Sequence, residues 1–322
     1  MARPVVYIHR VEWCPAEYYL TDANRRLLAS FAEVRDFGAH PRPVTHAEMV
    51  DNLRGANGVL LLNGSHPEEI TGKAMRESGT TVRVIAVSHW WPPIEAMARD
   101  LEGSGVEILD RSDACNQSVA EWTLGALING LRKTDVFDRL IKTKPGWPRW
   151  RGVAGQLNGA TVGLVALGRV GRWVARYLKP FDVRVLVYDP AVSAAQAVEL
   201  GIEKTDLDTL LRESDAVSLH APVLPSTKGM IGRRELALMR DGALLVNSAR
   251  AWLLDGAALL DELRSGRLRA YLDVFEPEPL PDNDPLRKLD GAVLTPHVAG
   301  TTDLMFERCG RFAIEALRER LS

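Results

Sequence analysis

The sequence predicts an α/β protein built from two parallel β-sheets, each with helices on both faces. Two observations lead to this fold class. Short apolar runs alternate with helical patterns and short loops along most of the 322 residues, an order typical of parallel sheets. Hydrophobic residues make up 46% of the chain, and this length and composition suit two domains with sizeable cores.

The expected strands are apolar runs too short to be helices. In the first part of the chain we expect strands at residues 5–8, 58–62 and 82–87, with helices at 22–32, 47–54 and 94–103. In the second part we expect strands at residues 162–165, 183–188, 216–220, 243–246, 268–274 and 292–294, and a closing helix at 303–320. The helix expected at 116–133 is apolar over more than one stripe, which suggests burial on several sides, part of it against a partner subunit.

Residues 162–189 are central because two apolar runs enclose a glycine-containing turn and a helical pattern. Gly168 would let the backbone approach a pyrophosphate at the helix N-terminus, and Gly171 would let helix and strand pack closely. Asp189 ends the second run, where a carboxylate accepts hydrogen bonds from ribose hydroxyls and repels a 2′-phosphate. NAD is therefore expected rather than NADP. Ala166 stands where this pattern has its first glycine.

The composition argues against several kinds of partner and site. A net charge of −2 gives no electrostatic case for nucleic acid or an anionic membrane. The N-terminus does not resemble a secretory signal, and no apolar run approaches the length of a membrane span. Cys14, Cys115 and Cys309 are far apart and lack CxxC spacing, so we expect no metal site and a cytoplasmic protein.

Two loops in the first part follow expected strands, at residues 63–67 and 88–93. Ligands of parallel sheets bind beyond the carboxyl ends of strands, so both loops are candidate walls of a substrate site. The second loop contains a Trp-Trp-Pro-Pro run. This run fits a rigid surface turn and an apolar lid over a small ligand equally well.

Arg250, Glu278 and His297 stand at strand ends of the second part. Each alone has an ordinary interpretation as a solvated or structural residue. Together they supply what hydride transfer between a carbonyl and an alcohol needs beside a nicotinamide. A guanidinium binds the substrate carboxylate, a histidine gives a proton to the developing alkoxide, and a carboxylate orients the imidazole and favours its protonated form.

Ordered motifs make the chain resemble the D-isomer-specific 2-hydroxyacid dehydrogenase family, most strongly from residue 112 to 300. The motifs are residues 163–171, His220-Ala221-Pro222, Asn247-Ser248-Ala249-Arg250, Asp273-Val274-Phe275-Glu276-Pro277-Glu278 and Leu294-Thr295-Pro296-His297. The resemblance implies that Arg250 binds the substrate carboxylate and carbonyl, that His297 is the acid/base, and that Glu278 is its partner.

The resemblance also implies a layout and further contacts. Two Rossmann-like domains would enclose the active cleft: a discontinuous, flavodoxin-like substrate domain (residues 1–112 and 300–322) and an NAD-binding domain (113–299). Members of the family are usually homodimers. The implied cofactor contacts are Gly168, Arg169, Val170, Asp189, Ala221, Pro222, Thr227, Ser248, Ala249, Asp273 and Gly300. The implied substrate contacts are Asn63, Gly64, Ser88, His89, Trp90 and Arg250.

We therefore expect an enzyme that uses NAD to interconvert a small 2-oxo acid and a D-2-hydroxy acid. A formate-dehydrogenase-like activity is disfavoured because that branch carries glutamine beside its histidine. An NAD-binding regulatory protein of the corepressor kind, with little or no turnover, keeps the same three residues and stays open. Residues 88–93 lack the glycine usual in that loop, and the two tryptophans there suggest a bulkier or more apolar substrate than glyoxylate. Trp252 follows closely on Arg250, so its indole is expected to crowd the site.

Overall fold

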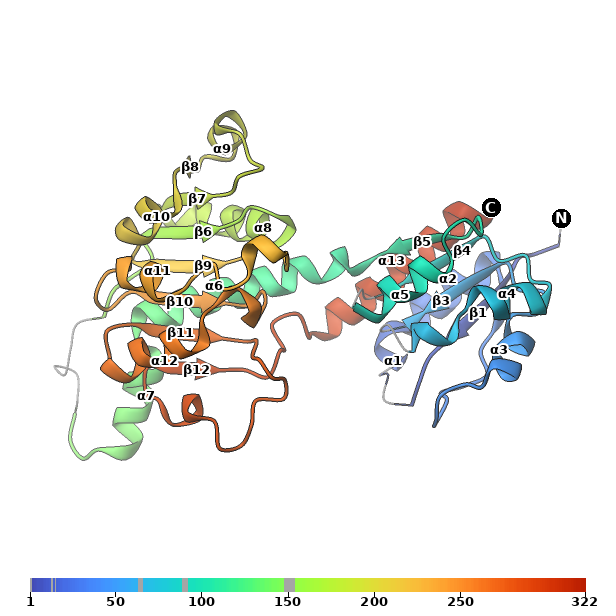
Figure 1. Ribbon diagram of the computed structural model, residues 1–322, viewed down its shortest axis with the longest axis horizontal. Helices are drawn as coiled ribbons and strands as arrows, with labels where there is room; N and C mark the ends of the chain where they lie inside the picture. The colour runs from blue at the N-terminus through green and yellow to red at the C-terminus, as the bar shows by residue number, and fades with distance from the viewer. Residues whose placement is uncertain (1, 13, 15, 63–65, 89–91, 148–153) are drawn as a thin grey trace. The chain divides into compact units, whose positions relative to one another are not determined.

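The computed structural model describes residues 2–12, 14, 16–62, 66–88, 92–147 and 154–322 (Figure 1). The chain divides into two compact units. Unit 1 comprises Met1–Cys115 and Thr301–Ser322, and unit 2 comprises Asn116–Gly300. The chain thus builds most of unit 1, continues into unit 2 and returns to unit 1 for its last helix.

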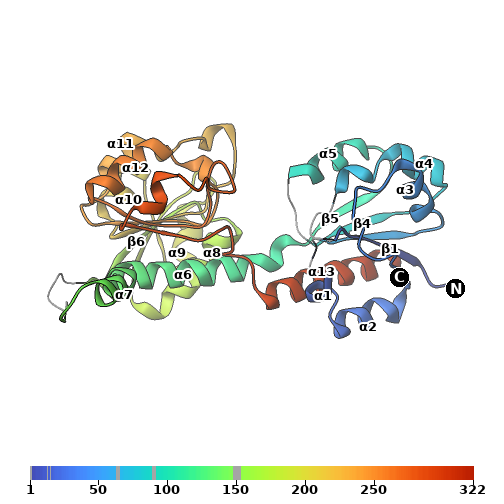
Figure 2. The same cartoon turned by 90° about the horizontal axis from the view of Figure 1, so that it is seen from below.

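Unit 1 is a five-stranded parallel sheet in the order β2-β1-β3-β4-β5. Within this unit, α3, α4 and α5 cover one face of the sheet, and α1, α2 and α13 cover the other (Figure 2). The strands are β1 (Val5–His9), β2 (Glu33–Arg35), β3 (Gly58–Leu61), β4 (Val84–Val87) and β5 (Glu107–Asp110). The helices are α1 (Ala16–Tyr19), α2 (Asp22–Phe31), α3 (His46–Leu53), α4 (Gly72–Ser78), α5 (Pro92–Asp100) and α13 (Asp303–Leu321).

Unit 2 is a seven-stranded parallel sheet in the order β12-β11-β10-β9-β6-β7-β8. Its strands are β6 (Thr161–Val165), β7 (Arg184–Tyr188), β8 (Glu203–Lys204), β9 (Ala216–Leu219), β10 (Leu244–Asn247), β11 (Arg269–Leu272) and β12 (Ala292–Leu294). Its helices are α6 (Asn116–Arg132), α7 (Thr134–Thr143), α8 (Arg169–Leu178), α9 (Ala194–Leu200), α10 (Leu207–Glu213), α11 (Arg233–Leu238) and α12 (Gly256–Ser265). Helices α6 and α8 pack on one face, and α10, α11 and α12 pack on the other.

The strand sequences explain why each sheet is buried on both faces. Every residue of β3, β4, β9 and β10 is buried, as the nearly continuous apolar runs of parallel strands require. Successive residues of β1 alternate between two cores: Val6 and Ile8 pack toward α13, whereas Tyr7 packs with Met49 of α3. The sequence of each strand therefore determines which side chains lie at its carboxyl end.

The predicted α/β fold class with two parallel sheets is confirmed. The sequence does not indicate β2, β5, β8 or α7. Three of these are short strands at sheet edges, with polar residues and little buried surface, and α7 buries no residue. None of the helices in the described part of the chain is long and apolar enough to cross a bilayer.

Candidate active site

The turn from β6 into α8 has the shape of a dinucleotide site. Gly168 is the N-cap of α8, and a side chain there would meet nothing within 4 Å, so open space lies beside the first amides of the helix. A Cβ on Gly171 would lie 2.7 Å from the carbonyl oxygen of Ala166, so only glycine lets helix and turn approach. Ala166 itself has φ 75°, the left-handed conformation that favours the missing glycine. The turn therefore keeps its shape despite the alanine.

Asp189 directly follows β7, and its carboxylate links the end of this strand to the turn before α8. Its Oδ2 accepts a hydrogen bond from the amide of Leu167 at 2.8 Å, and its Oδ1 accepts one from Ala191 at 2.8 Å. A carboxylate oxygen can accept a second bond, so ribose hydroxyls can still be bound there. Together, the open space at Gly168, the uncapped start of α8 and this carboxylate fit a dinucleotide without a 2′-phosphate.

The other expected cofactor contacts lie along the same edge of unit 2. Arg169 and Val170 begin α8, Ala221, Pro222 and Thr227 follow β9, Ser248 and Ala249 follow β10, Asp273 follows β11, and Gly300 ends the unit. The two hydroxyls among them are already engaged: the Thr227 hydroxyl donates to the Pro222 carbonyl at 2.7 Å, and the Ser248 hydroxyl lies 3.0 Å from that of Thr123 in α6. These two residues therefore shape the edge of the sheet and do not present free hydroxyls there.

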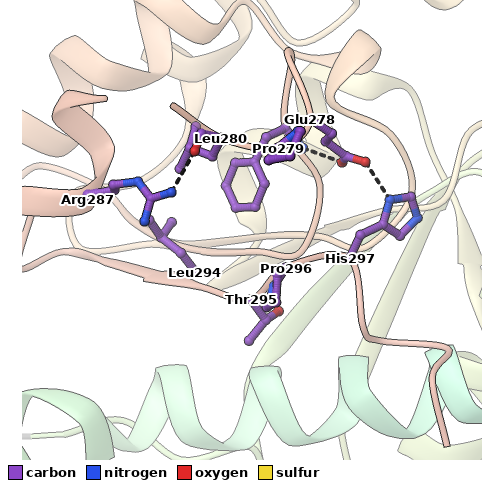
Figure 3. A pocket seen from close by; sticks show the side chains of 9 residues that line it. Glu278, Pro279, Leu280, Arg287, Leu294, Thr295, Pro296 and His297 are labelled. Carbon is purple, nitrogen blue, oxygen red and sulfur yellow. Dashed lines mark hydrogen bonds and ion pairs between the residues drawn. The ribbon is translucent and has the colours of Figure 1, made fainter. Parts of the chain in front are cut away.

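His297 and Glu278 form a hydrogen-bonded pair on two loops (Figure 3). His297 Nδ1 lies 2.8 Å from Glu278 Oε2, and Glu278 Oε1 accepts the amide of Phe275 at 2.8 Å. Burial alone would raise the pKa of Glu278, but the hydrogen bonds from His297 and Phe275 and the charges of His297 and Arg250 bring that pKa below its usual value. Glu278 is thus an ionised acceptor that fixes one ring nitrogen of His297.

Asp273 supports the loop that carries His297. It is 1% exposed, and its carboxylate accepts hydrogen bonds from the Thr295 hydroxyl (2.5 Å) and from the amides of Val298 (2.9 Å) and Ala299 (2.8 Å). Its carbonyl accepts the amide of His297 at 2.8 Å. His297 has φ 54°, an uncommon conformation for a histidine, and these bonds on both sides hold it there. The role of Asp273 as the anchor of this loop is not visible in the sequence.

Arg250 follows β10 and is exposed, with its Nη1 donating to the Ala249 carbonyl at 2.6 Å. Its charge contributes to the lowered pKa of Glu278. An apolar hollow adjoins the His297–Glu278 pair. It is lined by Phe275, Glu278, Pro279, Leu280, Arg287, Leu294, Thr295, Pro296 and His297 (Figure 3). Arg287 donates to the carbonyls of Leu280 and Pro281.

The structure describes only some of the remaining residues that are expected at the substrate site. Ser88 is buried directly after β4, whereas Asn63, Gly64, His89 and Trp90 lie outside the described residues. The indole of Trp252 donates to the carbonyl of Leu224 at 3.2 Å and lies under the ammonium of Lys228, 4.6 Å from the ring centre. That indole is therefore held by the loop after β9.

Comparisons with known proteins identify related chains. Residues 124–299 match the family described as D-isomer specific 2-hydroxyacid dehydrogenase, NAD binding domain. A glyoxylate reductase of Thermofilum pendens is 33% identical over 98% of this chain and 91% of its own length. A D-3-phosphoglycerate dehydrogenase of Archaeoglobus fulgidus is 38% identical over 62% of this chain, which is only 38% of its own length.

A solved structure adds to these matches. The NAD-complexed D-isomer specific 2-hydroxyacid dehydrogenase of Lactobacillus delbrueckii ssp. bulgaricus is similar over 98% of this chain and 96% of its own, with a TM-score of 0.82 and 25% identity. The similarity therefore covers both units and not only the match at residues 124–299.

Proposed function

Because the chain belongs to the D-isomer-specific 2-hydroxyacid dehydrogenase family, we propose that it uses NAD to interconvert a small 2-oxo acid and a D-2-hydroxy acid. The observation that carries this proposal is the 2.8 Å contact between His297 Nδ1 and Glu278 Oε2, on a loop fixed by Asp273. Such a pair delivers a proton from one defined atom. The three residues Arg250, Glu278 and His297 are its catalytic residues.

The reactive atom of His297 follows from its hydrogen bond. Glu278 occupies Nδ1, so Nε2 is the nitrogen that gives a proton to the developing alkoxide in reduction and takes it back in oxidation. Glu278 stays ionised because its pKa is lowered, so its carboxylate accepts the Nδ1–H of His297 and leaves Nε2 to exchange the proton with the substrate. The proton that Nε2 gives up neutralises the negative charge that develops on the substrate oxygen during reduction.

Arg250 supplies the second requirement, which is orientation of the substrate. Its guanidinium offers paired N–H groups to a carboxylate and can also reach the 2-oxo oxygen. At the other end of the site, Gly168 and the start of α8 hold a pyrophosphate, and Asp189 binds ribose hydroxyls. When bound there, NADH supplies the hydride. The residues of the chain supply position, charge and the proton.

The substrate side of the site belongs to unit 1 in this proposal. In this proposal, the residues that would contact the 2-oxo acid are Asn63, Gly64, Ser88, His89 and Trp90. Ser88 supports this because it directly follows β4 at the carboxyl edge of its sheet, where ligands of such sheets bind.

We also propose a homodimer and a cytoplasmic location. Helix α6 carries apolar residues that pack against the core of unit 2 and are only partly buried, which are Trp122, Leu124, Ile128 and Leu131. Helix α7 buries none of its residues and exposes Ile141. A second copy that covers these two helices would remove this surface from water. Light scattering coupled to gel filtration tests the dimer, and a monomer at micromolar concentration would contradict it.

The direct test of the activity follows NADH oxidation with a series of 2-oxo acids from glyoxylate to phenylpyruvate, with NADPH in parallel. We expect turnover on at least one acid and a preference for NADH. Binding of NADH with no turnover on any acid would contradict the proposal and favour a regulatory NAD-binding protein.

A further inference from the structure

A groove on unit 2, away from the His297–Glu278 pair, is lined by basic side chains of a single helix. Helix α8 contributes Arg169, Arg172 and Arg176, and Lys179 follows directly after the helix. The described residues that line the groove include no acidic side chain, and the groove has a volume of about 440 Å³. Pockets of about 300–1,000 Å³ hold small-molecule ligands. The groove therefore has the size and the charge to hold a small anion.

The sequence of α8 places these charges in one row. Val174 and Leu178 are buried in the core of unit 2, so basic residues spaced by three and four positions share the outer face. The row from Arg169 to Lys179 covers about 15 Å along the helix axis. Helix α8 contains no acidic residue, and like charges at this spacing destabilise a helix. Arg169 and Arg172 also lie near the N-terminus, where the helix dipole disfavours cations. The stability of α8 therefore does not explain the row.

Three of the basic side chains lack an acidic partner. In the parts of the chain that the structure describes, Arg172, Arg176 and Lys179 form no ion pair with a carboxylate, and all three are exposed. Arg176 instead lies over the indole of Trp173, with its Cζ 4.6 Å from the ring centre. This cation–π contact holds the guanidinium beside the groove and leaves its N–H groups able to donate to a ligand.

The lack of partners is not due to a shortage of carboxylates. The chain has 42 acidic residues against 40 lysines and arginines. On the neighbouring surface helix α11, Arg233 pairs with Asp261 at 2.7 Å, and Arg234 pairs with Asp208. A row of cations without such partners, along one groove, points to negative charges that a ligand supplies.

We propose that the groove lined by Arg169, Arg172, Trp173, Arg176, Lys179 and Asn116, here called the α8 groove, binds a small polyphosphate anion. Guanidinium groups bind phosphate oxygens through paired hydrogen bonds. A chain of phosphates can reach cations on successive helical turns, which are about 5.4 Å apart, whereas a single phosphate reaches fewer of them. Asn116 is the first residue of α6, so the positive end of that helix dipole adds to the same field.

Two features narrow the ligand further. The net charge of −2 disfavours a long polyanion such as a nucleic acid, because its remaining phosphates would meet acidic surface. Arg169 is also an expected contact of NAD, so Arg172, Arg176 and Lys179 are the residues that hold the polyphosphate. The proposal is independent of the reaction proposed above, and its test measures binding and not turnover.

Isothermal titration calorimetry without magnesium tests the proposal with phosphate, pyrophosphate and tripolyphosphate. We expect affinity to rise along this series, by about tenfold or more in total, because each added phosphate reaches a further charged donor. ATP in parallel distinguishes a nucleotide from a free phosphate chain as the source of the phosphates. We expect tripolyphosphate to bind more tightly than ATP, since Arg176 already covers one face of Trp173 against a base.

Paired variants test the residues. Arg172→Gln combined with Arg176→Gln should weaken tripolyphosphate binding by about tenfold or more. The combination of Arg172→Lys with Arg176→Lys keeps the charge and should lose less. Arg233→Gln combined with Arg234→Gln is the matched control, because it removes the same charge from α11, and it should bind tripolyphosphate as the wild type does.

A titration at saturating NADH separates the α8 groove from the dinucleotide site. Tripolyphosphate should still bind, because Arg172, Arg176 and Lys179 are not among the expected NAD contacts. Complete competition with NADH would mean that the anion occupies the dinucleotide site, and would overturn the proposal. Equal losses in the two glutamine double variants, affinity that does not depend on the number of phosphates, or equally tight binding of an oligoglutamate peptide would overturn it as well.

Discussion

The carboxyl edges of the two sheets differ in how their polar side chains are satisfied. In unit 2, Asp273 accepts three hydrogen bonds, and Glu278 and His297 bond to each other. In unit 1, His9 and Glu69 are more deeply buried, and their nearest atoms, Nε2 and Oε2, lie 3.4 Å apart. The first edge holds its chemical groups in place before any substrate arrives. The second edge contains a histidine whose pKa burial lowers to about 4.

This difference teaches that the two edges have different tasks. Groups that are bonded to one another are preorganised for the chemical step, and their loss should affect all substrates alike. A deeply buried titratable group such as His9 acts instead on the stability of the fold, and its loss should change how unfolding depends on pH.

The largest expected effect is that of His297→Ala. Removing a positioned general acid lowers kcat by about 10²–10⁴-fold, and the loss should be the same for every 2-oxo acid. NADH affinity should stay nearly unchanged. Steady-state kinetics and NADH fluorescence titration measure the two quantities. His46→Ala is the control, because His46 is an exposed histidine paired with Glu77. An unchanged kcat would remove His297 from the mechanism.

The second expected effect is a loss of stability in acid, which arises from His9 in unit 1. His9 has a pKa of about 4 in the folded protein against 6.5 for the ordinary side chain, so the unfolded chain binds the proton first as the pH falls. Stability is therefore complete above pH 6.5 and decreases toward pH 4, by about 3 kcal/mol for this one group.

Urea unfolding at pH 7, 5.5 and 4.5 measures this slope. His9→Gln should make the slope shallower, whereas His46→Gln should leave it as in the wild type because that imidazole is exposed. Equal slopes in the wild type and His9→Gln would show that His9 is not buried as a neutral ring.

A smaller effect is expected for Asp189→Ala in unit 2. Losing hydrogen bonds between a carboxylate and ribose hydroxyls should weaken NADH binding by about 10–100-fold. NADPH binding should fall much less, since the carboxylate no longer repels a 2′-phosphate. Asp241→Ala, at a carboxylate that is 89% exposed, is the control in the same titrations. Equal weakening of both cofactors would contradict the assignment of Asp189.

The smallest effect is expected for Ala166→Gly. Ala166 has φ 75°, a conformation that costs an L-residue about 1–2 kcal/mol. Glycine removes this cost, but it also raises the entropy of the unfolded chain, which offsets part of the gain in stability. We expect a net stabilisation of about 0.5–1 kcal/mol by urea unfolding. Ala175→Gly, inside α8, should instead destabilise. A loss of stability in Ala166→Gly would show that the turn is not strained.

The sequence predicts most of unit 2 because its motifs occur in order along the chain. Short apolar runs identify the strands, and Gly168, Gly171 and Asp189 mark the nucleotide end of the site. Arg250, Glu278 and His297 stand at strand ends, where the topology of a parallel sheet brings them to one edge. What the sequence does not reveal in unit 2 is how one side chain supports another, as Asp273 does for the loop of His297.

Unit 1 is harder to predict in detail for a physical reason. His9 and Glu69 are sixty residues apart, and nothing near either of them in the sequence indicates a polar partner. Their proximity arises only when β1 and β3 become neighbours and the turn after β3 folds over them. An isolated histidine at the end of an apolar strand is the one signal that could have pointed to this pair.

At the edge of unit 2, we expect NADH to transfer its hydride to one face of a 2-oxo acid, so that the 2-hydroxy acid product has a single configuration at C2. The direct measurement uses NADH carrying deuterium in place of the transferred hydrogen and the best 2-oxo acid from the substrate series. Mass spectrometry then follows the label, and chiral chromatography resolves the product. We expect a single D-2-hydroxy acid with one deuterium at C2. A racemic or L product, or a product without the label, would contradict the account.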